Sequence, residues 1–169
     1  MRRYAARNLD AHVTSIWPDA PGRLWIGTTK GLHRLTLAGD SDRVGQVDFF
    51  GTAHGLPVEW ITQVRRSKSG DLWVTTNGGL ARLDGQTSLR FKRYELSNST
   101  GMLQTLSMAE DGDHLWLGTS GGVARATTNG FSIFDATSGV ANAGAIFTSS
   151  ARRSRHGCGR PLAAPLAGW

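Results

Sequence analysis

The sequence predicts an all-β protein, a β-propeller fragment of three complete four-stranded blades with partial blades at both ends. A motif of Leu-Trp with Thr, Gly and Arg three, six and nine residues after the tryptophan occurs at Trp25, Trp73 and Trp116. The tryptophan spacings of 48 and 43 residues fit propeller blades better than helical repeats of about 34 residues. Because propellers have at least four blades, three blades cannot close a ring alone.

Turn chemistry divides each copy into short strands. In blade 1, expected over residues 11–56, the prolines and glycine of segment 18–22 should end the first strand, since proline removes a ladder donor. Residues 29–31 should form a three-residue hairpin connection in which Gly31 takes a positive φ. The four strands are therefore expected at residues 12–17, 23–28, 32–37 and 47–50.

A weaker motif links the blades: an aromatic residue, a four-residue spacer, a glycine and an aliphatic residue. It occurs at 50–56 and 134–140, and in a longer version at 94–102. Residues 4–9 are similar, with Asn8 in place of the glycine because asparagine tolerates the left-handed conformation. The remaining divisions are the last strand of a truncated blade at 1–10, blade 2 at 57–100, blade 3 at 101–140, and the start of a fourth blade with an irregular tail at 141–169.

The tail changes abruptly to Arg, Ala, Gly and Pro, and the expected fourth Leu-Trp is missing. Reading the codons shifted by one frame from His156 onward permits Arg-Leu-Trp, a Thr three residues later and a trailing Arg-Leu. The tryptophan of that frame would lie near position 158, which continues the period. We therefore hypothesise that residues from about 148 to 169 are out of frame, and the nucleotide sequence decides it. The alternative is a disordered, Arg- and Gly-rich terminus.

Composition excludes several classes of function. The net charge is +6, but seven of the basic residues lie near the two ends, leaving 12 basic against 13 acidic residues between positions 8 and 150. A nearly neutral repeat body argues against nucleic-acid binding. The single cysteine, Cys158, excludes an intramolecular disulfide and a cysteine-based zinc cluster. Neither a signal peptide nor a membrane-spanning stretch is recognisable.

The residues that are repeated among the three copies are interpreted as packing residues. The tryptophans should fill the wedge between adjacent blades, and Gly27 and Gly118 should avoid a clash with a neighbour. The threonines suit half-buried strands. The repeated arginines could form a ring of ligand-binding cations. The preferred interpretation is structural, with the arginines capping turns and pairing with a neighbouring blade's carboxylate, because they recur in every blade. These arginines are Arg34, Arg82 and Arg125.

No catalytic, cofactor or metal residues are assigned, and the ligand-binding residues are left unknown. The five histidines have no short ligand spacing and are interpreted as surface or turn residues. Segment 110–113 (Glu-Asp-Gly-Asp) starts like a calcium loop but does not continue as one, so it is interpreted as a turn. Nucleophile-elbow and phosphate-binding glycine motifs are absent. The histidines are His12, His33, His54, His114 and His156.

The repeat resembles the two-component regulator propeller, whose blades carry an Asp-x-x-Gly turn, Leu-Trp-Ile-Gly-Thr and then Gly-Leu-x-Arg. Residues 19–28 and 31–34 match this pattern almost throughout. The second copy departs from it at 67–70 and Thr75, and the third at Val123 and Ala126. The resemblance covers residues from about 4 to 147.

The resemblance implies the extracytoplasmic, ligand-sensing region of a hybrid sensor kinase, periplasmic in the full-length parent, that recognises a ligand such as a small glycan. This chain shows no kinase or receiver region, so it is expected to be a non-catalytic piece of such a sensor that needs no cofactor. Its own location is left open. Two unpaired blade faces should also make it self-associate.

Two alternatives remain. Related propellers include lyases and glycan-cleaving enzymes, and the Asp-x-x-Gly-x-x-Trp turn is similar to the Asp-box of sialidases. Sialidases also need an arginine triad and an active-site tyrosine, whereas Tyr4 and Tyr94 both lie in predicted blade-linking strands. The second alternative is a protein-binding scaffold of the WD40 kind, although the Trp-Asp and Gly-His signatures are missing.

Overall fold

The computed structural model describes residues 11–39, 43–85, 89–98, 101–112, 114–127 and 130–140. Within them, three antiparallel four-stranded sheets form, each with its strands hydrogen-bonded in chain order. Blade 1 contains β1 (Val13–Ala20), β2 (Arg23–Thr28), β3 (Gly31–Leu37) and β4 (Val44–Phe50). Blade 2 contains β5 (Ile61–Arg66), β6 (Leu72–Thr76), β7 (Gly79–Asp84) and β8 (Arg90–Tyr94). Blade 3 contains β11 (Thr105–Asp111), β12 (His114–Thr119), β13 (Gly122–Thr127) and β14 (Gly130–Phe134).

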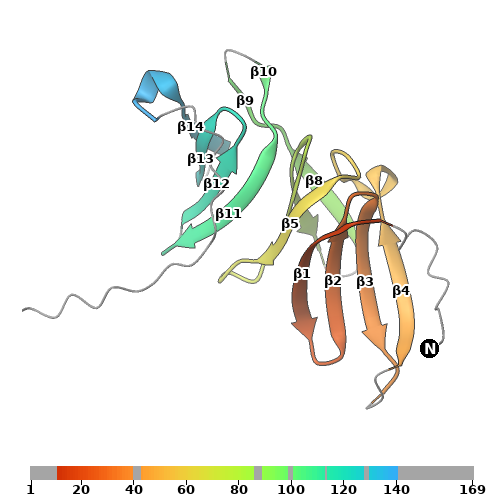
Figure 1. Ribbon diagram of the computed structural model, residues 1–169. Helices are drawn as coiled ribbons and strands as arrows, with labels where there is room; N and C mark the ends of the chain where they lie inside the picture. The colour runs from red at the N-terminus through yellow and green to blue at the C-terminus, as the bar shows by residue number, and fades with distance from the viewer. Residues whose placement is uncertain are drawn as a thin grey trace, which may run out of the picture.

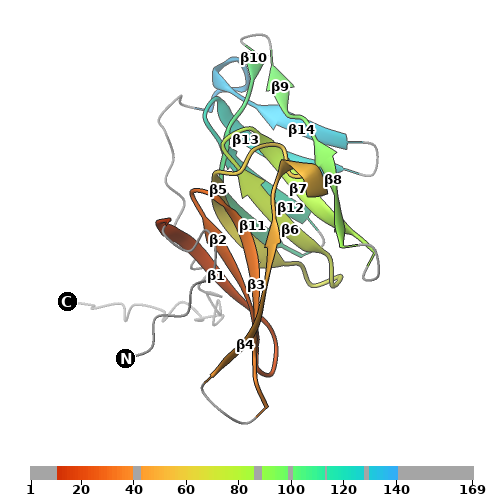
Figure 2. The ribbon, with the colours of Figure 1, turned by 90° about the vertical axis from the view of Figure 1, so that its right-hand side faces the viewer.

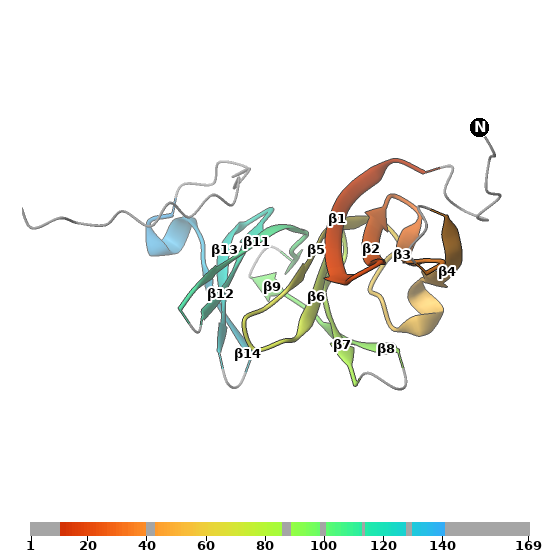
Figure 3. The same ribbon diagram turned by 90° about the horizontal axis from the view of Figure 1, so that it is seen from below.

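The three sheets stand side by side as an open row, with blade 2 in the middle (Figures 1 and 3). The first strands of consecutive blades contact one another, β1 against β5 and β5 against β11. This arrangement confirms three complete propeller blades that do not close into a ring. The expected partial blades, residues 1–10 and 141–169, and the out-of-frame tail lie outside the described residues. Within the described ranges, no helix is long and apolar enough to cross a membrane.

The hydrophobic core consists of two clusters, one at each contact between blades. We call these contacts the first junction, between blades 1 and 2, and the second junction, between blades 2 and 3. At the first junction, Trp25 of blade 1 packs with Leu56 and with residues of blade 2 such as Ile61 and Val64. At the second, Leu80 and the half-buried Trp73 pack against residues of blade 3. The tryptophans of blades 1 and 2 therefore lie between adjacent sheets, as predicted.

Two details of blade 1 differ from the prediction. Strand β1 continues through Pro18, which pairs with Leu24, instead of ending before it. Because β1 is an edge strand of its sheet, the missing proline N–H removes no ladder bond there. The β2–β3 connection has two residues instead of three: Gly31 already pairs with Thr28, and its φ of 123° confirms the predicted positive value.

The connections between blades take two forms, both at the same end of the molecule (Figures 1 and 2). After blades 1 and 3 the chain makes short 3-10 helices, η1 (Thr52–His54) and η2 (Ala136–Ser138), each ended by a left-handed glycine. After blade 2, the connection that is longer by two residues instead forms a hairpin of β9 (Ser97–Asn98) and β10 (Gly101–Met102). The extra length is thus used for a small two-stranded sheet.

Each repeated arginine lies directly across the sheet from the tryptophan of its own blade. Trp25 pairs with Arg34, and the equivalent pairs form in blades 2 and 3. The guanidinium carbons lie 5.6–5.7 Å from the indole centroids, within cation–π range. Arg34 also pairs with Asp48 on the adjacent strand of the same blade. A structural role therefore fits the geometry, but the predicted partner in a neighbouring blade is wrong for Arg34, since its carboxylate lies in its own sheet.

The repeated threonines do more than fill half-buried positions. Thr28 Oγ1 donates to the carbonyl of Gly31 at 2.8 Å and accepts from the N–H of Lys30 at 3.1 Å. Thr76 and Thr119 make the same pair of bonds in blades 2 and 3. All three threonines are buried. Each hydroxyl therefore closes the two-residue turn that follows it, a role that the β-propensity argument missed.

The expectation that all histidines are surface or turn residues is wrong for His33. It lies on β3, fully buried, and neither ring nitrogen has a hydrogen-bond partner among the described residues. Its neighbour is the Phe49 ring, with centroids 5.4 Å apart. Burial lowers the pKa of His33 below its ordinary 6.5. His12 and His114 are exposed, His54 Nδ1 accepts from the N–H of Gly51, and His156 lies outside the described residues.

Candidate functional site

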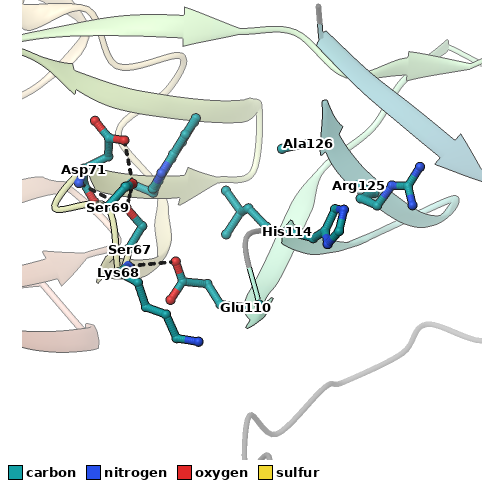
Figure 4. A pocket seen from close by; sticks show the side chains of 11 residues that line it. Ser67, Lys68, Ser69, Asp71, Glu110, His114, Arg125 and Ala126 are labelled. Carbon is teal, nitrogen blue, oxygen red and sulfur yellow. Dashed lines mark hydrogen bonds between the residues drawn. The ribbon is translucent and has the colours of Figure 1, made fainter. Parts of the chain in front are cut away.

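A groove of about 580 Å³ opens at the second junction, at the end of the sheets where β5 turns into β6 and β11 into β12. This size lies in the range of small-molecule sites. Its floor is formed by Trp73, Leu115 and Ala126, and polar side chains surround it. Figure 4 shows the β5–β6 turn on one side and the blade 3 residues on the other. The polar residues are Ser67, Lys68, Ser69, Asp71, Glu110, His114 and Arg125.

The groove exists in part because blade 3 has a small residue where blade 2 has a large one. Leu83 follows the repeated arginine of blade 2 and packs into the first junction, together with Trp17. The corresponding residue of blade 3, next to Arg125, is Ala126, which lines the groove. Alanine lacks the three outer carbons of leucine, so the space that Leu83 fills at the first junction stays open at the second.

The β5–β6 turn on one side of the groove is held by its own hydrogen bonds. Ser67 Oγ accepts from the N–H of Asp71 at 3.0 Å and lies 2.7 Å from Ser69 Oγ. Ser69 Oγ lies 2.9 Å from Asp71 Oδ2, to which it donates. The main chain adds bonds from Ser67 N–H to the Asp71 carbonyl and from Gly70 N–H to the Ser67 carbonyl. These contacts fix the turn before any ligand binds, which lowers the entropy cost of binding.

Two contacts place the charged groups of the other side. Glu110 Oε1 accepts from the backbone N–H of Lys68 at 3.0 Å, so this bond ties blade 3 to the β5–β6 turn (Figure 4). The Arg125 guanidinium lies beside Trp116 and Phe134, 5.6 and 5.9 Å from their ring centroids, within cation–π range of both. Its Nε is buried and has no partner in the described part of the chain. The groove therefore combines an apolar floor with fixed donors and acceptors of both charges.

At the first junction, the corresponding polar edge is closed by an ion-pair cluster. The Asp19 carboxylate binds Arg23 Nε of its own blade at 2.5 Å and also Arg66 of blade 2. Burial by itself raises the pKa of Asp19, but the hydrogen bonds and charges of Arg66 and Arg23 outweigh it and hold the pKa below its ordinary 3.8. Asp19 is the aspartate of the Asp-x-x-Gly motif, and here it joins two blades.

No metal centre is indicated by the geometry of the described residues, because they contain no group of three or more His, Cys, Asp or Glu that could hold an ion. Segment 110–113, considered above as a calcium loop, ends β11 at Asp111 and turns at Gly112, while Asp113 is not described. Tyr94 ends β8 and packs between Trp73 and Phe131. It is therefore a packing residue at the second junction.

The sequence left the ligand-binding residues unknown, yet it contained a signal for the groove. The departures of the second and third copies from the repeat include residues 67–70 and Ala126. Ser67, Ser69 and Ala126 meet at the groove, although they come from different blades. Positions where a repeat breaks its own pattern can thus mark a site, but only the fold shows that these departures are neighbours.

Solved structures support the propeller assignment. The extracellular domain of a putative hybrid two-component system from B. thetaiotaomicron is 25% identical over 73% of this chain and 16% of its own, with a TM-score of 0.63. A second such domain from the same organism is 22% identical over 83% and 19%, with a TM-score of 0.62. These similarities are consistent with the two-component regulator propeller repeat that the sequence resembles. This chain spans less than a fifth of either domain.

A propeller enzyme is similar in fold alone. Virginiamycin B lyase from Staphylococcus aureus is 19% identical over 76% of this chain and 42% of its own, with a TM-score of 0.56. No protein-family model matches the chain. A search of curated proteins finds no match either.

Proposed function

We propose that this chain is a ligand-sensing part of the extracytoplasmic propeller of a two-component sensor, and that it is not catalytic. The proposal extends the similarity to extracellular domains of two-component systems to this chain's own role. In a full-length parent, the region would lie in the periplasm and pass ligand binding on to an output domain. The single observation that carries a binding role is the groove at the second junction.

The groove fits a small, hydroxyl-rich ligand such as a glycan fragment. Trp73 offers an indole surface, on which an apolar sugar face can pack. Fixed carboxylates at Asp71 and Glu110 accept hydrogen bonds, while Lys68 and Arg125 donate them. Because two acidic and two basic side chains balance, the groove does not select a strongly charged ligand.

Tryptophan fluorescence of the full chain, titrated with a panel of neutral disaccharides and uronic-acid disaccharides, tests this role. We expect saturable binding of at least one neutral disaccharide. Ala126→Leu restores the side chain that fills the first junction, so it should abolish binding while leaving the protein folded. Ala20→Leu, at the exposed end of β1, is the matched control and should bind normally.

The same samples separate a sensor from an enzyme. If the bound disaccharide is recovered with unchanged mass after long incubation, binding occurs without turnover, as expected for a sensor. Cleaved or eliminated products that disappear with Ala126→Leu would overturn the non-catalytic proposal in favour of a lyase or glycan-cleaving enzyme. Binding that survives Ala126→Leu would show that the groove is not the site.

A further inference from the structure

The first strands of neighbouring blades are joined by a hydrogen bond that repeats along the row. Ser15 Oγ on β1 accepts from the N–H of Val64 on β5 at 3.0 Å. Gln63 Oε1 on β5 accepts from the N–H of Met108 on β11 at 2.6 Å. Strand register makes Ser15, Gln63 and Ser107 equivalent, because they pair with Gly27, Thr75 and Gly118. Blades 1 and 2 thus each offer a side-chain acceptor to the first strand of the next blade.

Blade 3 carries this acceptor without a donor. The hydroxyl oxygen of Ser107 is buried and has no hydrogen-bond partner among the residues that the structure describes. An unpaired buried polar group costs free energy, and the repeat shows which donor belongs there: the N–H of a residue equivalent to Val64 and Met108. Beside Ser107 lies a hollow of about 500 Å³, lined by Met108, Trp116, Leu117, Gly118 and Val123 among others. We call this surface the open face of blade 3.

Blade 1 exposes the complementary residues. Ile16 is the counterpart of Val64 and Met108, by its pairing with Ile26. Its side chain is 59% exposed, whereas Val64 and Met108 are 1% and 2% exposed. Val13 is likewise the counterpart of Ile61 and is 52% exposed, against 0% for Ile61. Uncovered apolar side chains at positions that are otherwise buried indicate a missing neighbour.

The first junction shows how the two surfaces fit. A Cβ placed on Gly27 would lie 2.7 Å from Ile61 Cγ2, so the Ile61 side chain packs directly against Gly27. Gly118 of blade 3 is the equivalent of Gly27. Val13 of another blade 1 would take the place of Ile61 above Gly118, and Ile16 would take the place of Val64. The N–H of that Ile16 would then meet the unpaired Ser107 hydroxyl.

We propose that two copies of this chain associate head to tail, with the open face of blade 3 in each copy covered by β1 of the other. Such a contact uses different surfaces on the two sides and must either close or grow. The described residues of two copies supply six blades, and six lies within the four to eight of closed propellers. The dimer is therefore a closed six-bladed ring that repeats the inter-blade contact at both seams. It concerns this chain by itself and does not depend on the ligand proposed above, since in a longer parent further blades would cover the same two faces.

Sedimentation velocity of the full chain over a wide range of concentrations tests the ring. We expect a species of twice 18.2 kDa. Ile16→Lys should weaken association by about a hundredfold or more, because a buried charge would have no partner. Gln46→Lys adds the same charge on the exposed outer strand β4 and should leave the dimer intact. Ser107→Ala should weaken association by about two- to tenfold without lowering the stability of the monomer.

Mixing variants tests the head-to-tail geometry. Gly118→Leu should block the open face of blade 3, so this variant and Ile16→Lys should each be monomeric alone. A mixture of the two retains one intact seam and should form a heterodimer. A wild-type chain that stays monomeric would overturn the proposal and leave the face to a further blade of a longer chain. Unlimited growth with concentration, or absence of the heterodimer, would equally overturn the closed ring.

Discussion

The two junctions between blades are built from the same repeated positions, but they are packed to different degrees. At the first, Trp25 is 1% exposed and Leu83 completes the packing. At the second, Trp73 is half-buried, and a groove of about 580 Å³ lies where Ala126 replaces the leucine. A repeat can therefore keep its architecture and still open a site, because one shortened side chain leaves a space that the rigid sheets do not collapse to fill.

The polar edges of the junctions differ as well. Asp19 at the first junction is held by two arginines, one from each blade. At the second, Glu110 of blade 3 meets only a backbone N–H of the blade 2 turn in the contacts described. The first edge is thus an ion pair that locks two blades together. The second leaves side-chain charges available to a ligand.

The largest expected difference between the junctions concerns their tryptophans. Trp25→Ala should lower the free energy of unfolding by about 3–5 kcal/mol, as for other buried aromatic residues. Trp73→Ala should cost clearly less, since the indole already borders open space. Urea unfolding followed by circular dichroism measures both. Equal losses would show that the second junction is packed as tightly as the first.

A second comparison uses the residue that follows the tryptophan by two positions. Gly27→Ala should cost about 1–3 kcal/mol, because the added Cβ would lie 2.7 Å from Ile61 Cγ2. In an Ile61→Ala background the same substitution should cost little, since the clashing atom is gone. A double-mutant cycle by urea unfolding measures this coupling. A penalty that is unchanged in the Ile61→Ala background would contradict the close contact.

The pH dependence should single out blade 1, because its β3 carries His33 where the other blades have Ala81 and Ala124. The pKa of His33 is lowered in the fold, so the unfolded chain binds a proton that the folded chain does not. Stability should therefore be full above about pH 6.5 and fall below it, by at most about 1.4 kcal/mol per pH unit. His33→Ala should remove this slope in urea midpoints measured from pH 7 to 5. The exposed-site control His114→Ala should keep it.

The smallest expected effect is that of the ion pair at the first junction. Asp19→Asn should cost up to about 1 kcal/mol, because both arginines are partly exposed. Since the pKa of Asp19 is lowered, this contribution is present above about pH 3.8 and is lost as the pH falls through the lowered pKa. Glu110→Gln is the matched change at the second junction and should cost less. Thermal unfolding at low and high salt distinguishes them, and a salt-independent effect of Asp19→Asn would count against ion pairing.

Most of the fold was predictable, because the repeat aligns equivalent residues. Residues 23–28 form the expected second strand, and Gly31 takes its positive φ. The errors arose where side chains act locally. Pro18 stays in the strand because β1 is an edge, and Arg34 finds Asp48 in its own sheet. Sequence spacing does not say which strand is an edge or which carboxylate lies opposite.

The candidate site was much less predictable. Residues 67–70 and Ala126 depart from the repeat, but this signal does not by itself locate a groove, because the space belongs to two blades and is defined by a missing side chain. The burial of His33 has a related cause: ligand spacing says nothing about burial, whereas the first three residues of β3 are all buried and the Phe49 ring packs against His33. A site that lies between two repeats can therefore be predicted only when the packing of those repeats is known.

The hydrogen bonds made by the hydroxyl groups of Thr28, Thr76 and Thr119 have an evolutionary consequence. Each of these side chains supplies the hydrogen bonds of the turn that follows it, so the turn residues at 29–30, 77–78 and 120–121 need not stabilise their own conformation. Mutations at 29–30 and 120–121 are therefore less constrained by folding, whereas a Cβ on Gly78 would lie 2.7 Å from Val58 Cγ1. A chain of this kind can vary most of these hairpin tips, which lie at the end of the sheets away from the groove, without first acquiring compensating stability.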